Sequence, residues 1–247
     1  MSGHSKWSTI KRQKGAADIK RGIVFTKMTR EIMLAAREGG GNPEGNFRLR
    51  LAVDRARAVN MPHANIDRAI ERATGGGEGV QIESVLYEGY GPGGVSIMVE
   101  AATDNRNRTA PEIRAAFTRH GGKLGESGSV QWIFEQKGVI EIDAGGRSTD
   151  DIQLVAIDAG AEDVEVDGSL VTVYTTPTAF ERVKKAIEAA AIPIASAEIS
   201  MRPSNSVRLE GDKARQVLAL VEGLEDLDDV QKVHANFDIP VEVLQNA

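Results

Sequence analysis

A glycine-rich run, Thr74-Gly-Gly-Gly-Glu-Gly79, divides the chain into two parts with different hydrophobic periods. Before the run, apolar residues recur every three or four positions, as they do on one face of an α-helix. After it, apolar and polar residues alternate and β-branched residues become common, as in strands. The sequence therefore predicts a helical N-terminal part joined by a flexible linker to a part built on sheets.

Three helices are predicted before this linker. The first covers residues 16–38 and ends at Gly39-Gly40-Gly41, the second follows Asn46, and the third begins near Pro62. Each has an apolar face, so together they predict a small helical bundle. The apolar positions are Phe25, Met28, Ile32 and Ala35 in the first helix, Leu49, Ala52, Val53 and Ala56 in the second, and Ile66, Ala69, Ile70 and Ala73 in the third.

Strand patterns dominate the rest of the chain. Residues 85–90 and 95–101 predict a hairpin, followed by a helix over 111–119 and a strand over 130–134. Residues 138–202 then follow the order strand, helix, strand, strand, helix, strand, which is typical of a ferredoxin-like unit. The tail adds a strand at 206–209, a helix at 212–221 and a strand at 230–235. Because these elements are too few for a stable domain, we infer that the tail returns to complete the hairpin domain.

The predicted fold class is therefore α+β, with three domains. Residues 1–79 form a basic helical bundle with its Gly-rich linker. Residues 80–134 plus 205–247 form a discontinuous middle domain of helices and strands, and residues 135–204 form a ferredoxin-like βαββαβ domain inserted into it.

Charge is distributed unevenly along the chain. The net charge is −6, but residues 1–74 hold 15 Lys and Arg against 7 Asp and Glu, net +8, whereas residues 75–247 hold 15 against 29, net −14. Because Lys and Arg neutralise phosphates and release condensed counterions, the first part predicts affinity for DNA or RNA. The acidic part is not expected to share that ligand.

Candidate contacts to nucleic acid come from three places in the sequence. Near the N-terminus, cations surround Trp7, which either stacks on an unpaired base or anchors this segment in the core. On the predicted helices, Asp54 can pair with Arg57 or Arg50, and Asp67 with Arg68 or Glu71 with the neighbours of Arg72, so ion pairing competes with phosphate binding there. The predicted contact residues are Lys6, Trp7, Lys11, Arg12, Lys14, Lys20, Arg21, Lys27, Arg30, Arg57, Arg106 and Arg108.

Arg106 and Arg108 of this set belong to a predicted loop over residues 103–109. Asn107 or Thr109 would cap the helix that follows, and the two arginines would project from the loop. The loop is either an anion site or a capped turn with solvated arginines.

No constellation of catalytic residues is found in the sequence. There is no cysteine, and the four histidines do not have the spacing of metal ligands. The glycine clusters at 91–94 and 121–125 lack the features of a phosphate-binding loop and are interpreted as turns. We therefore expect a protein that is not an enzyme and needs neither cofactor nor metal.

Apolar runs in the sequence are too short for a signal sequence or a membrane span. We therefore expect a cytoplasmic protein that does not bind membranes. No dimerisation heptad is found, so a monomer is compatible with the sequence, and its oligomeric state is left open.

Several motifs together resemble the YebC family, also called YebC/PmpR. They are Gly3-His-Ser-Lys-Trp7, Asn60-Met-Pro62 followed by Asn65-Ile66 and Arg68-Ala-Ile70, Tyr87-Glu-Gly-Tyr-Gly-Pro92, Thr103-Asp-Asn105 with Asn107-Arg-Thr109, Gly121-Gly-Lys-Leu-Gly125, Gly128-Ser-Val130, Trp132 and Leu227-Asp-Asp-Val-Gln231. The resemblance covers nearly the whole chain and implies the same three-domain fold. It also implies either DNA-binding regulation of transcription or, from mitochondrial and ribosome-associated relatives, activation of translation and relief of stalling, including at proline runs.

The leading hypothesis is a DNA-binding regulator of transcription, and the alternative is a ribosome-associated translation factor that binds rRNA or tRNA. The sequence contains no clear recognition helix of a helix-turn-helix, which leaves reading of a specific DNA sequence unsupported. A hydrolase built on Asp104, Asn105 and Arg106 is the least favoured hypothesis.

Overall fold

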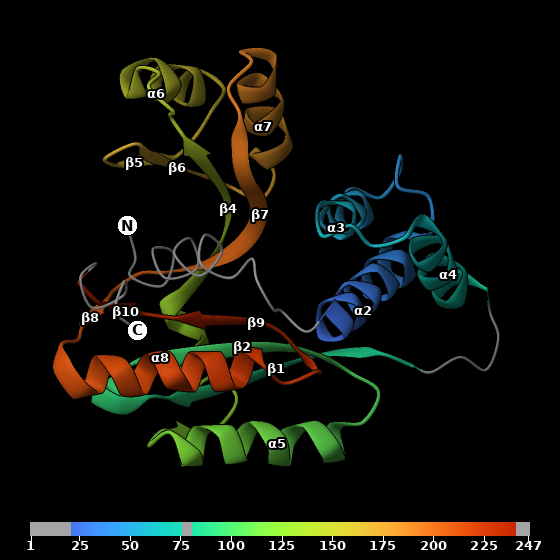
Figure 1. The fold of residues 1–247 in the computed structure, drawn as a ribbon, viewed down its shortest axis with the longest axis vertical. Helices are drawn as coiled ribbons and strands as arrows, with labels where there is room; N and C mark the ends of the chain where they lie inside the picture. The colour runs from blue at the N-terminus through green and yellow to red at the C-terminus, as the bar shows by residue number, and fades with distance from the viewer. Residues whose placement is uncertain (1–20, 76–80, 241–247) are drawn as a thin grey trace. The chain divides into compact units, whose positions relative to one another are not determined.

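The computed structural model describes residues 21–75 and 81–240, which form a mixture of helices and sheets (Figure 1). These residues divide into two compact units. One unit is residues 132–206, and the other combines the described residues up to 131 with those from 207 onward. One unit is therefore inserted into the sequence of the other. The further division of the larger unit into a helical and a middle domain stays a prediction.

Within residues 21–75, three helices precede the sheets, as predicted. They are α2 (Arg21–Gly39), α3 (Phe47–Ala58) and α4 (His63–Thr74). Residues 16–20 of the first predicted helix lie outside the described residues. The predicted apolar faces form one core with Ile82 and Ala102, which come from the sheet part of the same unit. Its fully buried members include Ile32, Leu49 and Ala56.

The turn between α2 and α3 is fixed by Asn46, a buried residue whose side chain joins the two helices. Its amide donates to the carbonyl oxygens of Ala35 at 2.7 Å and Gly40 at 2.8 Å. Its Oδ1 accepts from the N–H of Leu49 at 3.1 Å, so it is also the N-cap of α3. A polar residue can be buried here because every polar atom of its side chain has a partner.

A four-stranded antiparallel sheet with the order β3-β1-β2-β9 forms the centre of the larger unit. The predicted hairpin is β1 (Glu83–Tyr90) with β2 (Ser96–Thr103). Beside it lie β3 (Lys123–Leu124) and β9 (Val230–Ala235), so the hairpin and the C-terminal tail share a sheet. A short parallel pair, β8 (Val207–Arg208) with β10 (Phe237–Asp238), accompanies it.

Two helices cover one face of this sheet, α5 (Arg106–Arg119) and α8 (Gly211–Glu225) (Figure 1). Ile97 and Val99 of β2 pack with Phe117 of α5 and Leu220 of α8, and all four are fully buried. The alternating pattern of β2 therefore directs every second residue into this core.

The inserted unit has the predicted order of elements. It consists of β4 (Phe134–Asp143), α6 (Thr149–Asp158), β5 (Asp163–Asp167), β6 (Leu170–Thr175), α7 (Phe180–Ala189) and β7 (Ile194–Pro203). The antiparallel strands have the order β5-β6-β4-β7. Ile140 pairs with Val173 and Ile142 with Val171 across the two central strands, and all four are fully buried.

Two predicted elements are wrong. Residues 130–134 are not a strand: Gln131–Ile133 form a short 3-10 helix, and β4 begins only at Phe134. The helix predicted to begin at Pro111 begins at Arg106, capped by Asn105. Proline is favoured in the first turn of a helix, which suggested the later start.

Candidate nucleic-acid interface

Half of the predicted contact residues, Lys6, Trp7, Lys11, Arg12, Lys14 and Lys20, lie outside the described residues. Arg21 begins α2, and only its backbone is described. The structure places the other five, Lys27, Arg30, Arg57, Arg106 and Arg108, in three different surroundings.

Lys27 and Arg30 lie on the side of α2 that faces the end of α8. The Lys27 ammonium donates to the carbonyl oxygen of Glu225, and the Arg30 guanidinium donates to that of Asp228. A second Arg30 nitrogen lies 2.8 Å from Asp229 Oδ1, and the Arg30 side chain is 15% exposed. These two cations therefore hold elements of the larger unit together.

Asp229 is the centre of this arrangement, and we call Arg30, Thr103, Arg108, Thr109 and Asp229 the Asp229 centre. The Asp229 carboxylate accepts from Thr103 Oγ1 at 3.1 Å, Thr109 Oγ1 at 2.5 Å and Arg108 Nη2 at 2.7 Å. Its side chain is 2% exposed. Burial alone raises the pKa of Asp229, but the hydrogen bonds from Thr109 and Arg108 and the charge of Arg30 outweigh it, so the pKa lies below its ordinary value.

Arg106 and Arg108 do not project from a loop, which corrects the prediction. Both lie in the first turn of α5, because Asn105 Oδ1 accepts from the N–H of Arg108 at 3.2 Å and caps the helix there. Arg106 binds Glu83 with two nitrogens, one of them at 2.7 Å, and Arg108 also binds Asp104 at 2.8 Å. Neither Asn107 nor Thr109 is the cap. Carboxylates therefore match both charges.

Arg57 forms the predicted pair with Asp54, at 3.7 Å, and both side chains are about half exposed. Most other arginines of α2 and α3 also have partners. Arg55 binds Glu31 at 2.6 Å, Arg48 binds Glu38, and Arg37 donates to the carbonyl oxygen of Ile82 at 3.1 Å. Most of the arginines in α2 and α3 therefore bind other groups of the protein.

Arg68 and Arg72 of α4 differ from these arginines. Within residues 21–75 and 81–240, no carboxylate or other hydrogen-bonding group pairs with either side chain, and both are exposed. The expected pair of Asp67 with Arg68 is not formed, because Asp67 binds His63 at 2.8 Å. Adjacent helical residues do not face each other, whereas residues four apart do. These two guanidiniums are therefore available to a phosphate.

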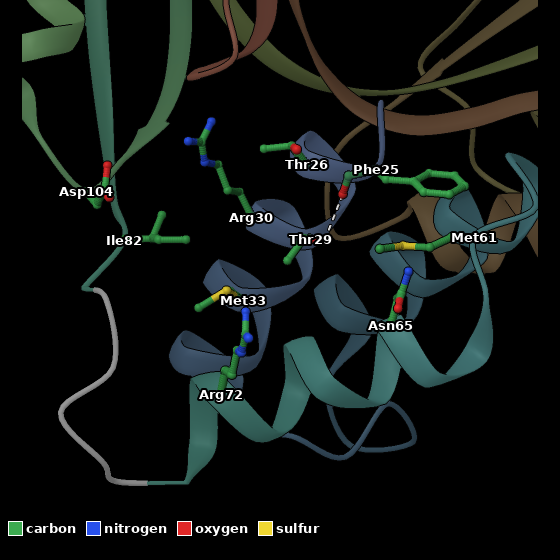
Figure 2. Close-up of a pocket in the computed structure, with 10 residues that line it drawn as sticks. All are labelled: Phe25, Thr26, Thr29, Arg30, Met33, Met61, Asn65, Arg72, Ile82 and Asp104. Atoms are coloured by element: carbon green, nitrogen blue, oxygen red, sulfur yellow. Dashed lines mark hydrogen bonds between the residues drawn. The ribbon is translucent and has the colours of Figure 1, made fainter. Parts of the chain in front are cut away.

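A hollow of about 590 Å³ lies next to Arg72, and we call it the α2–α4 hollow. Figure 2 shows Ile82 and Asp104 on one side of it and Met61 and Asn65 on the other, with α2 between them. Its lining comes from α2, the turn before α4, α4 and the residues at the ends of β1 and β2. The lining residues are Phe25, Thr26, Thr29, Arg30, Met33, Met61, Asn65, Arg72, Ile82 and Asp104.

Glu88 is a buried acid in β1 and is not among the residues predicted to have a function. Its carboxylate accepts from three backbone N–H groups, those of Gly128 at 2.6 Å, Val130 at 2.7 Å and Gln131 at 2.8 Å. Burial raises the pKa of Glu88, but these three hydrogen bonds bring it below the ordinary value. Glu88 therefore holds the loop that follows β3. The only signal in the sequence was an acidic residue inside a strand pattern.

A metal site is not formed by the described residues: no group of three or more His, Cys, Asp or Glu among them could hold a metal ion. Two of the histidines are paired with carboxylates, His63 with Asp67 and His234 with Glu100, each at 2.8 Å. No helix in the described part of the chain is both long enough and apolar enough to cross a membrane.

Several known proteins resemble this chain over nearly its whole length. A protein of Rubrobacter xylanophilus named "Probable transcriptional regulatory protein" is 55% identical, covering 99% of this chain and 98% of its own length. A protein of the same name from Dictyoglomus thermophilum is 54% identical over 100% of this chain and 99% of its own.

Among solved structures, the crystal structure of a conserved hypothetical protein from Aquifex aeolicus, Aq1575, matches with a TM-score of 0.84 and 48% identity. The match covers 92% of this chain and 94% of that one.

Two family models account for most of the sequence. The TACO1/YebC protein N-terminal domain matches residues 5–76, and the TACO1/YebC second and third domain matches residues 82–237. The junction between the two matches falls at the glycine-rich linker. This chain therefore belongs to the TACO1/YebC family of probable transcriptional regulatory proteins.

Proposed function

We propose that this protein binds nucleic acid through its helical N-terminal part, and that it regulates transcription by binding DNA. Relatives that match it over nearly their full length are named "Probable transcriptional regulatory protein", which supports a regulator of gene expression. Binding of DNA by this chain is our inference from the distribution of its charges.

The observation that carries the proposal is the pair Arg68 and Arg72 on α4. They are four residues apart and so share a face of the helix, and neither side chain has a partner among the described residues. Guanidinium groups that have no partner within the protein bind phosphate well because they present several N–H donors in a fixed plane. The cations before α2, Lys6, Lys11, Arg12, Lys14 and Lys20, would extend this surface along the backbone of the ligand.

Arg30, Arg106 and Arg108 contribute less in this proposal, because carboxylates of the protein already match their charges. Residues 1–79 act as the ligand-binding domain of a three-domain protein. The discontinuous domain and the inserted ferredoxin-like domain, which carry the excess of negative charge, face protein or solvent.

A second candidate function, in translation, is favoured by the surface of α4. This helix follows α3 after a short turn, but it exposes Asp67 and Glu71 as well as its arginines. Two carboxylates on a helix repel the phosphates that border the major groove, which disfavours a recognition helix. Folded or single-stranded RNA does not require such a helix, so the same cations would suit a ribosome-associated factor that binds rRNA or tRNA.

Crosslinking the full-length protein in cells and sequencing the bound nucleic acid, together with polysome gradients, separates the two candidates. Enrichment of promoter DNA supports the role in transcription. Co-migration with ribosomes and enrichment of rRNA or tRNA would replace it with the role in translation. Recovery of no nucleic acid above background would reject both.

The electrostatic part of the proposal is tested by charge reversal at Lys11, Arg12, Lys14 and Lys20. The slope of log affinity against log salt should fall by roughly 0.7 to 0.9 for each phosphate that the variant no longer binds. The matched control reverses four cations of the acidic part and should keep the slope. The control positions are Arg147, Lys184, Lys185 and Lys213.

A further inference from the structure

We propose that the α2–α4 hollow binds one unpaired nucleotide of a single-stranded nucleic acid, with its base inside the hollow and its phosphates on Arg68 and Arg72. This inference rests on the proposed function, because it locates one contact of the nucleic acid that the helical part binds. It assigns a ligand to a site that the charge pattern alone does not reveal.

The inner part of the hollow suits a base because its surface is apolar. Met33, Met61 and Ile82 are nearly buried, and Phe25 is partly buried in the same core. Flat aromatic bases gain affinity when they leave water and pack against apolar or aromatic side chains. The volume, about 590 Å³, lies within the range of about 300–1,000 Å³ that small-molecule sites have.

Asn65 provides a polar group that can distinguish one base from another. Figure 2 shows its side chain extending from α4 toward Met61, at the edge of the apolar lining. It is half buried, and among the described residues its side-chain amide has no hydrogen-bond partner. An asparagine amide presents a donor and an acceptor side by side, which matches the N6 and N7 positions of adenine. The larger purine ring also covers more of the apolar lining than a pyrimidine ring does, so the site should prefer adenine to cytosine.

Arg72 provides the charge at the other end of α4. Its side chain extends toward Met33 in Figure 2, so its guanidinium lies at the border of the hollow. Arg68 lies one turn earlier on the same helix, and Asn65 shares their face because the three residues are spaced by three and four positions. A base near Asn65 and a phosphate near Arg72 thus place the nucleotide along one face of α4.

Polar groups on the opposite side of the hollow do not compete for this ligand. Arg30 binds Asp229, and Asp104 binds Arg108. The hydroxyls of Thr26 and Thr29 donate to the carbonyl oxygens of Gly22 and Phe25. Asn65 and Arg72 are therefore the groups of the lining that remain available to form new hydrogen bonds.

The test measures fluorescence anisotropy of labelled ten-nucleotide strands of oligo(A) and oligo(C), as RNA and as DNA, with the full-length protein. We expect the wild-type protein to bind oligo(A) at least roughly fivefold more tightly than oligo(C), as a bidentate base contact provides. Asn65→Leu should reduce this preference and leave the salt dependence intact. Arg72→Gln should weaken binding of both strands and lower the salt slope by about 0.7.

Arg114→Gln is the matched control, since Arg114 is an exposed arginine on α5 whose side chain also has no partner among the described residues. It should change neither preference nor slope. Thermal melts should be unchanged in all three variants, because none of these side chains has a hydrogen-bond partner there.

The outcomes separate this inference from the proposed function. If the wild-type protein binds single strands but Asn65→Leu and Arg72→Gln behave like it, the nucleotide site is wrong and the proposed function stands. Binding of duplex DNA with no binding of single strands also overturns the site alone. If no nucleic acid binds at all, both fail. The strand that binds more tightly, RNA or DNA, identifies the kind of nucleic acid that the site prefers. Either result supports the site.

Discussion

The arginines of α4 and those at the start of α5 have similar neighbours in the sequence, but only those of α5 form ion pairs in the structure. Each pair has acidic residues within a few positions, Asp67 and Glu71 in α4 and Asp104 before α5. In α5, however, Arg106 pairs with Glu83 and Arg108 pairs with Asp229, two carboxylates that are distant in the sequence. Among the described residues, no carboxylate distant in the sequence pairs with Arg68 or Arg72 of α4. An arginine-rich motif therefore does not define a phosphate site until its long-range partners are known.

The largest expected effect comes from Asp229→Asn. The change removes the charge that Arg30 and Arg108 share and weakens the hydrogen bonds from Thr103 and Thr109. We expect the free energy of unfolding to fall by about 3 kcal/mol, as when a buried ion pair loses one partner. Urea denaturation measures it. Asp228→Asn is the control, because the Asp228 side chain is exposed. A similar loss of stability in this control would show that the buried carboxylate of Asp229 does not contribute more than an exposed one.

The stabilisation that Asp229 provides should also depend on pH. Because the pKa of Asp229 is lowered in the folded protein, its stabilisation is complete above its ordinary value of 3.8 and is lost as the pH falls through the folded-state value. The difference in unfolding free energy between the wild type and Asp229→Asn should therefore narrow below pH 3.8. Urea denaturation from pH 5 to 2.5 tests this, and a constant difference would contradict it.

Glu88→Gln should have a smaller effect, about 1–2 kcal/mol, because hydrogen bonds to a charged acceptor are worth more than those to an amide. Glutamine keeps one acceptor oxygen and turns an NH2 group toward N–H groups of the loop after β3. Thermal unfolding gives the change in stability. Glu126→Gln, in the same loop and exposed, should be neutral. Equal melting temperatures for both variants would show that the three backbone hydrogen bonds do not matter.

Binding measurements compare the two arginine pairs directly. Arg72→Gln should weaken binding of single-stranded oligonucleotides several-fold, as the removal of one phosphate-binding cation does, whereas Arg106→Gln should leave it nearly unchanged because Glu83 already holds Arg106. Titrations at two salt concentrations suffice. The reverse order of effects would place the phosphate site on α5, as the sequence pattern suggests.

The smallest effect is expected for Arg57→Gln. Its pair with Asp54 is long and exposed, and such pairs are worth about 0–0.5 kcal/mol. Chemical denaturation should not separate this variant from the wild type by more than that. A larger loss would mean that the surface arginines of α3 stabilise the bundle after all.

Much of the fold could be predicted from the sequence, because its signals are local. Asn46 and the apolar positions of α3 specify that helix from within a few residues, and the alternation in β1 and β2 specifies their hairpin. The start of α5 was missed because Pro111 favoured a late start, which makes Asn107 or Thr109 the expected cap, whereas Asn105 caps the helix. Only the observed hydrogen bond from the Arg108 N–H distinguishes them.

The candidate site was less predictable than the fold. Asp228 and Asp229 are identical neighbours, yet one is exposed and the other is the buried acceptor of the Asp229 centre. The α2–α4 hollow combines residues from α2, the turn before α4, α4 and the ends of β1 and β2, and no short segment of the sequence contains them all. For Lys6 to Lys20, which lie outside the described residues, the predicted role remains the one that charge alone supports.

The helical and strand segments, the split between a basic and an acidic part, and the family all follow from the amino-acid sequence. These properties depend on composition and on neighbours within a turn or a strand. The tertiary structure decided which cations are neutralised: Arg108 meets Asp229 across 121 positions of the chain, while Arg68 and Arg72 meet no carboxylate in the described part. An ion pair depends on distance in space, and only the folded chain sets that distance.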